Sequence, residues 1–104
     1  MINLYEYKRI HCIGIGGIGL SAIAEILISR GYTVSGSDMR ESEITDRLAD
    51  DGAVIYTGNR GENVEDKELI IYSAAVGSDN PELVRAGELG IPAIKRAMAL
   101  GDLM

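Results

Sequence analysis

Cysteine and proline are scarce in this chain of 104 residues, which has one cysteine, Cys12, and two prolines. A single cysteine excludes an internal disulfide and is compatible with a reducing cytoplasm. No apolar run approaches the roughly 20 residues that span a membrane, and residues 1–9 are too polar for a signal peptide. The sequence therefore predicts a soluble, cytoplasmic protein with no membrane partner.

Positively charged residues are also few. The sequence has 10 Lys and Arg residues against 16 Asp and Glu residues, which gives a net charge of -6. Nucleic-acid binding usually requires a basic face, so the balance argues against a nucleic-acid partner. Small anionic ligands stay compatible with it, since helix N-termini and backbone amides bind phosphate without side-chain charge.

The residue patterns that commonly carry catalysis are missing. There is no Gly-Lys-Ser/Thr loop, no Ser–His–Asp set with readable spacing and no Cys/His cluster with metal-ligand spacing. His11 and Cys12 lie in an apolar segment, where a histidine is more often structural than catalytic and a cysteine acts as a small core hydrophobe. The sequence predicts a domain that binds, with no catalytic residue, metal ligand or cofactor of its own.

Apolar segments of two kinds alternate along the chain. β-rich runs occur at residues 9–15, 32–36, 53–56, 69–72 and 91–94, and helical spacing or capping signals occur between them and after the last. This order predicts a Rossmann-like, doubly wound α/β fold with a mostly parallel five-stranded sheet. Residues 1–104 would form a single domain. Because the chain stops inside apolar helical sequence at residues 97–104, we expect more chain beyond it in the native protein.

A glycine-rich loop follows the first β-rich run. Gly14-x-Gly16-x-x-Gly19 matches the dinucleotide fingerprint, and Asp38 closes the second strand about 20 residues later. In this interpretation Gly14 permits a tight turn, Gly16 lets the backbone approach a diphosphate, and Gly19 lets the helix pack on the strand. The amides of the first helical turn would face the anion.

A second group of candidate residues follows the fourth strand, where ligands of open parallel sheets are bound. Small residues there make room, and Ser73 offers a hydroxyl. Asn80 is interpreted as a helix cap. Asn59 and Arg60, after the third strand, could lie on the same rim, but a solvated turn is the preferred interpretation. The complete predicted nucleotide site is Gly14, Gly16, Gly17, Ile18, Gly19, Ser37, Asp38, Ser73, Ala74 and Ala75.

Several motifs, in order, resemble the Mur ligase family of peptidoglycan-synthesising enzymes, and within it the members that add L-alanine to UDP-N-acetylmuramate. The resemblance covers nearly the whole chain. It rests on residues 11–21 (HCIGIGGIGLS), 36–38 (GSD), 73–76 (SAAV), 79–82 (DNPE), 91–92 (IP) and 96–97 (RA). Gly16-Gly17 fits these members better than the related ligases that recycle muramyl peptides. Asn59 is a departure, since some relatives carry histidine there.

The resemblance implies an ATP-dependent amide ligase with three domains. The first binds the UDP part of UDP-N-acetylmuramate, the second binds ATP and Mg²⁺, and the third helps to bind the amino acid. ATP phosphorylates the muramyl carboxylate, and the amine of L-alanine attacks the acyl phosphate. This chain would be the first domain alone, inactive by itself, with the central ATP-binding and C-terminal domains absent.

Two other functions are also compatible with these residues. An NAD-binding Rossmann domain of a dehydrogenase or regulatory module would use the same glycine loop and Asp38. A plain interaction domain would bind no nucleotide. The segments at residues 73–76 and 79–82 favour the ligase.

Overall fold

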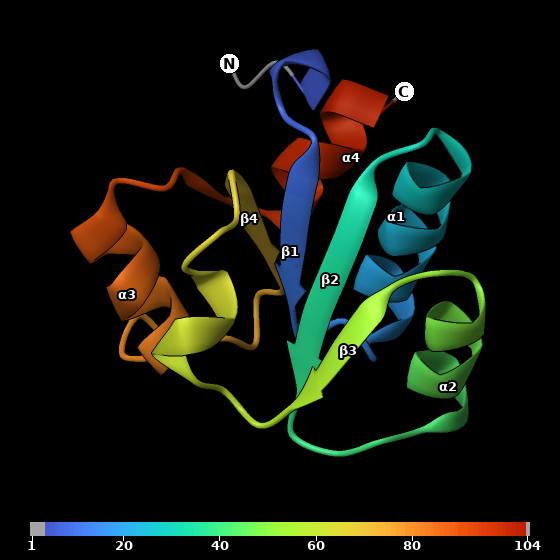
Figure 1. Ribbon diagram of the computed structural model, residues 1–104, viewed down its shortest axis with the longest axis horizontal. Helices are drawn as coiled ribbons and strands as arrows, with labels where there is room; N and C mark the ends of the chain where they lie inside the picture. The colour runs from blue at the N-terminus through green and yellow to red at the C-terminus, as the bar shows by residue number, and fades with distance from the viewer. Residues whose placement is uncertain (1–3, 104) are drawn as a thin grey trace.

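Five parallel strands form the centre of the molecule. The structure is a computed structural model that describes residues 4–103. The strands lie in the order β3-β2-β1-β4-β5, and every neighbouring pair is parallel (Figure 1). Their bounds are β1 Arg9–Ile13, β2 Thr33–Asp38, β3 Val54–Thr57, β4 Leu69–Tyr72 and β5 Ala93–Lys95. The predicted Rossmann-like α/β class is confirmed, with a sheet that is wholly parallel.

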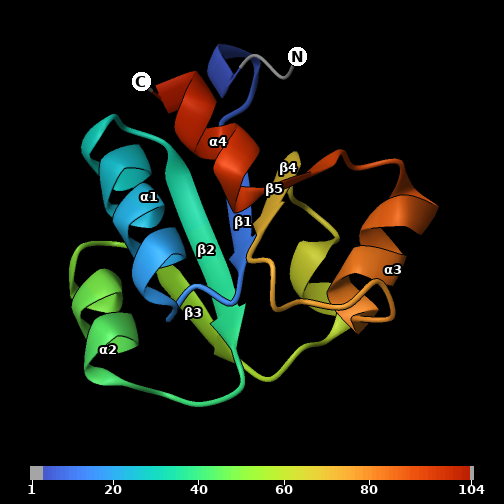
Figure 2. The ribbon, with the colours of Figure 1, turned by 180° about the vertical axis from the view of Figure 1, so that it is seen from behind.

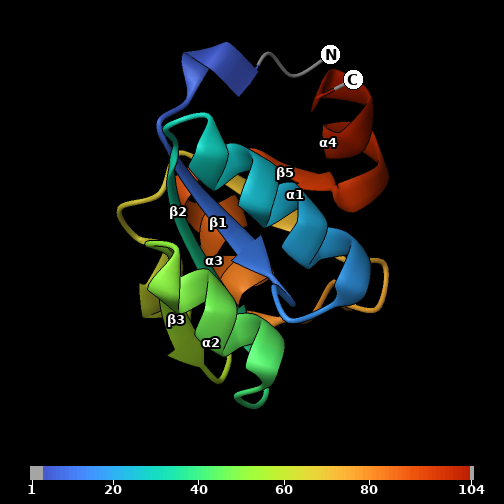
Figure 3. The same ribbon diagram turned by 90° about the vertical axis from the view of Figure 1, so that its right-hand side faces the viewer.

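Helices cover both faces of this sheet. Seen from behind, α1, α2 and α4 lie over one face, while α3 and the 3-10 turn η2 lie on the other (Figure 2). Figure 3 shows α1 and α2 side by side over the sheet. The helix bounds are α1 Ile18–Ser29, α2 Glu43–Asp50, α3 Pro81–Leu89 and α4 Arg96–Leu103; the 3-10 turns are η1 Leu4–Glu6 and η2 Gly61–Val64. None of the described helices is long and apolar enough to cross a bilayer.

Alternate residues of β1 face opposite layers, as the pleat of a strand requires. Ile10 and Cys12 pack in the larger core cluster together with Leu27 of α1, whereas Ile13 packs in a smaller cluster with Ala86 of α3. Strands covered on both faces are apolar in nearly every position, which explains the continuous hydrophobic runs in the sequence.

Local signals set where the elements begin and end. The Asn80 side chain accepts a hydrogen bond from the Glu82 amide, Pro81 opens α3, and Gly90 ends it with φ 73°, so the predicted Asn80 cap is confirmed. β1 ends two residues earlier than predicted because Gly14, with φ 83°, turns the chain. The last helix begins at Arg96, and Met104 lies outside the described residues.

Cys12 supplies a test of this packing. Its side chain is fully buried, and burial raises the pKa of the thiol from 9.0 to about 12. Because the thiolate is the reactive form, we expect no reaction with Ellman's reagent at about pH 8 until guanidinium unfolds the chain. The unfolded thiol ionises above pH 9.0, so ionisation of Cys12 lowers the free energy of unfolding as pH rises from there towards about 12.

Absorbance at 412 nm would follow the labelling, with glutathione as the accessible-thiol control. Rapid labelling of the native chain would contradict the burial of Cys12.

Candidate functional site

A cavity of about 400 Å³ lies at the carboxyl ends of β1, β2 and β4. Ile13 ends β1, Asp38 ends β2 and Ser73 follows β4, so the parallel register brings three distant segments to one edge. The lining residues are Ile13, Gly14, Gly17, Asp38, Met39, Asn59, Ser73, Ala75, Val76, Gly77, Asp79 and Asn80. This is the edge at which ligands of open parallel sheets are bound.

The glycine loop forms one wall of the cavity, and its first four amides are already bonded within the protein. Those of Gly14 and Ile15 donate to the Ser37 carbonyl at 2.8 and 3.0 Å, that of Gly16 donates to Asp38 Oδ2 at 2.9 Å, and that of Gly17 donates to the Gly14 carbonyl at 3.0 Å. The loop is therefore held rigidly before any ligand arrives.

The next three amides are the free ones. Gly17 caps α1 without a side-chain hydrogen bond, and within the described part of the chain the amides of Ile18, Gly19 and Leu20 have no acceptor. Unpaired amides and the helix dipole together favour an anion at this point. These three amides belong to the first turn of α1, which is where the sequence analysis expects the donors to an anion.

Two glycines of the fingerprint make room for neighbouring side chains, in addition to the roles predicted for them. A Cβ atom on Gly16 would lie 2.8 Å from Asp38 Oδ2, and one on Gly19 would lie 2.9 Å from the Arg96 guanidinium. The absence of a side chain at Gly16 leaves room for the Asp38 carboxylate, and its absence at Gly19 leaves room for the Arg96 side chain. The tight turn predicted at Gly14 is confirmed by its φ of 83°.

Arg96 is a residue that the sequence analysis did not assign to the site. It is the first residue of α4, and its side chain lies against the start of α1 beside Gly19. No acidic side chain among the described residues forms an ion pair with it, whereas Arg9, Arg47, Arg60 and Arg85 are all paired. An unpaired guanidinium beside free helix amides extends the anion-binding potential of the loop.

Asp38 holds the glycine loop to the end of β2. Its Oδ2 atom accepts from Gly16 and its Oδ1 atom accepts from the Met39 amide at 2.8 Å. The side chain is partly buried and lines the cavity, so each oxygen has a further lone pair for a ligand hydroxyl. Asp38 thereby has a structural task in addition to the predicted ligand contact.

The predicted residues divide into three groups in the structure. Five line the cavity: Gly14, Gly17, Asp38, Ser73 and Ala75. Gly16, Ile18 and Gly19 belong to the same loop but are not part of the lining. Ser37 is fully buried beneath the cavity, and Ala74 lines a neighbouring hollow with Tyr72 and Lys95.

The expectation of a solvated turn after β3 is wrong for Asn59. Its side chain lines the cavity, and its Oδ1 atom lies 3.3 Å from the Ser37 hydroxyl. Arg60 is exposed and forms an ion pair with Glu62 at 3.6 Å, which agrees with a solvated turn. Asn59 follows the end of β3 by two residues, and its place after a parallel strand is the signal for a position at this edge.

Two large apolar side chains are exposed around the site. Ile18, at the start of α1, is 85% exposed, and Met39, after β2, is 71% exposed. The Met39 sulfur atom also accepts a hydrogen bond from the Asn59 side-chain Nδ2 at 3.1 Å. Exposed apolar surface beside a polar cavity suits contact with the planar or ring parts of a ligand.

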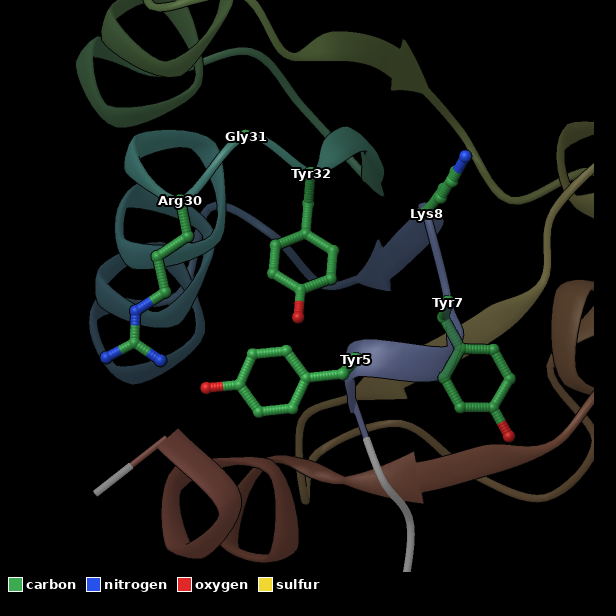
Figure 4. Close-up of a pocket in the computed structure, with 6 residues that line it drawn as sticks. All are labelled: Tyr5, Tyr7, Lys8, Arg30, Gly31 and Tyr32. Atoms are coloured by element: carbon green, nitrogen blue, oxygen red, sulfur yellow. The ribbon is translucent and has the colours of Figure 1, made fainter.

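A second hollow, of about 560 Å³, lies at the amino ends of β1 and β2, away from the glycine loop (Figure 4). The Tyr32 hydroxyl points toward the Tyr5 ring in this view, while the Lys8 side chain points away from both rings. Its place at the amino ends of the strands separates it from the position used by ligands of this fold. Within the described part of the chain, no group of three His, Cys, Asp or Glu side chains is placed to hold a metal.

Comparison with known proteins establishes the relationships of the chain. The family model described as "Mur ligase family, catalytic domain" matches residues 9–104, a span that includes every residue of the cavity. The chain belongs to the Mur ligase family. The resemblance found in the sequence motifs is thus confirmed at the family level.

Relatives within the Mur ligase family are close. The UDP-N-acetylmuramate–L-alanine ligases of Alkaliphilus metalliredigens and Acetivibrio thermocellus are 55% and 54% identical over 96% and 95% of this chain. The solved structure of UDP-N-acetylmuramate–alanine ligase from Thermotoga maritima superposes with a TM-score of 0.87 at 40% identity and covers 90% of this chain. The chain spans only 22%, 21% and 22% of the lengths of these three proteins.

Proposed function

We propose that this chain is the UDP-sugar-binding domain of an enzyme that joins L-alanine to UDP-N-acetylmuramate. The proposal is carried by relatives of that name that match almost the whole chain at more than half identity. The cavity at the carboxyl edge of the sheet supplies a place for the ligand, and the free amides of α1 supply donors for its diphosphate.

The charges of the site are consistent with a diphosphate held by amides and by one cation. Asp38 and Asp79 line the cavity and would repel an anion placed against them. The diphosphate would therefore lie toward the start of α1, between the amides of Ile18 to Leu20 and the Arg96 guanidinium. Asp38 would then face a hydroxyl of the ribose, and the exposed Ile18 and Met39 side chains would contact ring atoms.

The chemical step belongs, in this proposal, to regions that the chain does not span. No Gly-Lys-Ser/Thr loop is present in the sequence to hold ATP and Mg²⁺, and no group of three His, Cys, Asp or Glu side chains among the described residues is placed to bind a metal. ATP, Mg²⁺ and L-alanine would be bound by the central and C-terminal domains of the whole enzyme. The role of this chain is to bind and orient the UDP end of the substrate.

Calorimetric titration of the chain tests the proposal. We expect saturable binding of UDP-N-acetylmuramate, weaker binding of UDP because the sugar contacts are lost, and no binding of NADH. Heat released on mixing would be measured at matched ligand concentrations and low ionic strength, where interactions with phosphate are least screened.

NADH is the informative rival because a dinucleotide domain would use the same glycine loop and Asp38. Binding of NADH without binding of UDP-N-acetylmuramate would overturn the proposal in favour of a dinucleotide function. Binding of neither ligand by the folded chain would refute the assignment of the UDP site to this domain alone.

A further inference from the structure

A buried hydrogen-bonded network lies under the cavity, on the face of the sheet covered by α3. Glu82, in the first turn of α3, is fully buried, and its Oε1 atom accepts hydrogen bonds from His11 Nε2 of β1 and from the Ser37 hydroxyl of β2 at 2.9 Å. The His11 Nδ1 atom lies 2.7 Å from the Ser35 hydroxyl. One carboxylate thus connects a helix to the two central strands.

The network is more than an ordinary element of the core, because a carboxylate is costly to bury. Removing a charged group from water is compensated only by charge partners and hydrogen bonds. Glu82 Oε1 has two donors, but within the described residues Glu82 Oε2 has none. An apolar side chain of similar size would fill this position without the cost of desolvating a charge. Core packing therefore does not explain why a carboxylate is present here.

Ser37 links this network to the walls of the cavity. Its carbonyl accepts the amides of Gly14 and Ile15, which begin the glycine loop. Its hydroxyl donates to Glu82 and lies 3.3 Å from Asn59 Oδ1, and Asn59 also lines the cavity. A shift of Ser37 would therefore move the glycine loop and the turn after β3 together.

The start of α3, which also contributes to the lining of the cavity, is connected to the network directly through Glu82. Glu82 follows the Asn80 cap by two residues, and Asn80 and Asp79 line the cavity. Because the Glu82 side chain is bonded to β1 and β2, the start of α3 cannot slide along the sheet without breaking those hydrogen bonds. The glycine loop, the turn at Asn59 and the start of α3 thus all connect to the Glu82–Ser37 hydrogen bond.

We propose that Glu82 is a positioning residue of the binding site: through Ser37 and His11 it holds the glycine loop, the turn at Asn59 and the start of α3 in the register that binds the ligand. The identity of the ligand rests on the proposed function, whereas the coupling of the three walls does not. The role requires the hydrogen bonds accepted by Oε1, so a neutral side chain that keeps that acceptor should preserve it.

Three substitutions separate this role from a contribution to stability alone. Glu82→Ala removes the acceptor and should weaken UDP-N-acetylmuramate binding by about 10-fold or more, the scale of one lost hydrogen bond to a charged group. Glu82→Gln retains Oε1 and should bind within about 3-fold of the unsubstituted chain. Glu88→Ala, on the exposed side of the same helix, is the matched control and should leave affinity unchanged.

Affinity is measured at a temperature where circular dichroism shows each variant to be folded. If folded Glu82→Ala binds as tightly as the unsubstituted chain, Glu82 has only a structural role and the proposal is overturned. Equal loss in Glu82→Gln and Glu82→Ala would also overturn it, because charge and not the positioning hydrogen bonds would then be responsible.

Coupling through Ser37 gives a second test. Ser37→Ala removes the hydroxyl but leaves the carbonyl that holds the glycine loop. If Glu82 acts through that hydroxyl, adding Ser37→Ala to Glu82→Ala should cause little further loss. The affinity of the double variant should lie within about 2-fold of that of Glu82→Ala. Fully additive losses would show that the two side chains act independently.

Amide hydrogen exchange decides the inference even if the chain fails to bind the UDP-sugar. In Glu82→Ala the amides of Gly14 and Ile15 should exchange faster than in the unsubstituted chain. The Ala53 amide is the control, because it is bonded to Leu48 away from the network, and its exchange should accelerate less. Equal acceleration at all three amides would indicate general destabilisation and refute the positioning role. Failure of binding with the expected exchange would refute only the proposed function.

Discussion

Replacing Gly36 with alanine is expected to lower the free energy of unfolding by about 1–3 kcal/mol, the range for overpacking a tight core. Gly36 lies in β2, and a Cβ atom there would lie 2.6 Å from Ile15 Cβ and 2.8 Å from Ile15 Cγ2. Ile15 is fully buried, and its Cβ atom cannot move without its backbone. The same displacement would reach the glycine loop, so ligand affinity should fall as well.

Urea denaturation followed by circular dichroism would measure the change, with the slope of the transition expected to stay constant. Gly87→Ala is the matched control. A Cβ atom at Gly87 meets nothing within 4 Å, the residue lies inside α3, and its φ is not in the left-handed region. This control should stabilise the chain by roughly 0.5–1 kcal/mol. A Gly36→Ala chain as stable as the parent would contradict the observed packing of Ile15.

Replacing Arg96 with alanine is expected to weaken UDP-N-acetylmuramate binding by roughly 10- to 100-fold, the range for losing a hydrogen bond to a charged group. The guanidinium lies beside Gly19, has no ion-pair partner among the described residues, and is next to the free amides of α1. Asp38 and Asp79 make the cavity itself acidic, so loss of this cation removes the attraction that opposes them. Unfolding free energy should change by less than about 0.5 kcal/mol, as for other surface substitutions.

Isothermal titration of the variant with UDP-N-acetylmuramate and with UDP would locate the effect. If Arg96 contacts the diphosphate, both ligands should lose affinity by the same factor, and the dependence of binding on salt should become less steep. Arg47→Ala, which removes an exposed cation paired with Glu25, is the control and should bind as the parent does. Unchanged affinity in Arg96→Ala would remove Arg96 from the site.

The order of elements and the location of the glycine loop could be predicted because both depend on residues that are close in sequence. The alternation of apolar runs and glycines predicted all five strands, and the pair Asn80-Pro81 predicted the start of α3. Cap and turn geometry is a local property of the backbone, so short motifs determine it. Strand ends were less accurate, since a positive φ at Gly14 ended β1 early.

Tertiary structure alone decided which side chains complete the site. Glu82 bonds to His11, 71 residues away in the sequence, and Arg96 lies against Gly19 although one belongs to α4 and the other to α1. Neither contact leaves a periodic signal. Ser37, a predicted site residue, is fully buried, and its hydroxyl donates a hydrogen bond to Glu82, a contact that its sequence position did not reveal.

By itself the sequence determined the parallel α/β fold, the family and the edge of the sheet where the glycine loop lies. Hydrophobic periodicity, glycines and caps act over a few residues, and they are sufficient for those features. Which cation stands beside the free amides of α1 and which buried carboxylate joins the walls of the cavity depended on the packing of α4 and α3 against the sheet. Packing brings together residues that are far apart in the chain, and their side-chain directions follow only once every element has its place.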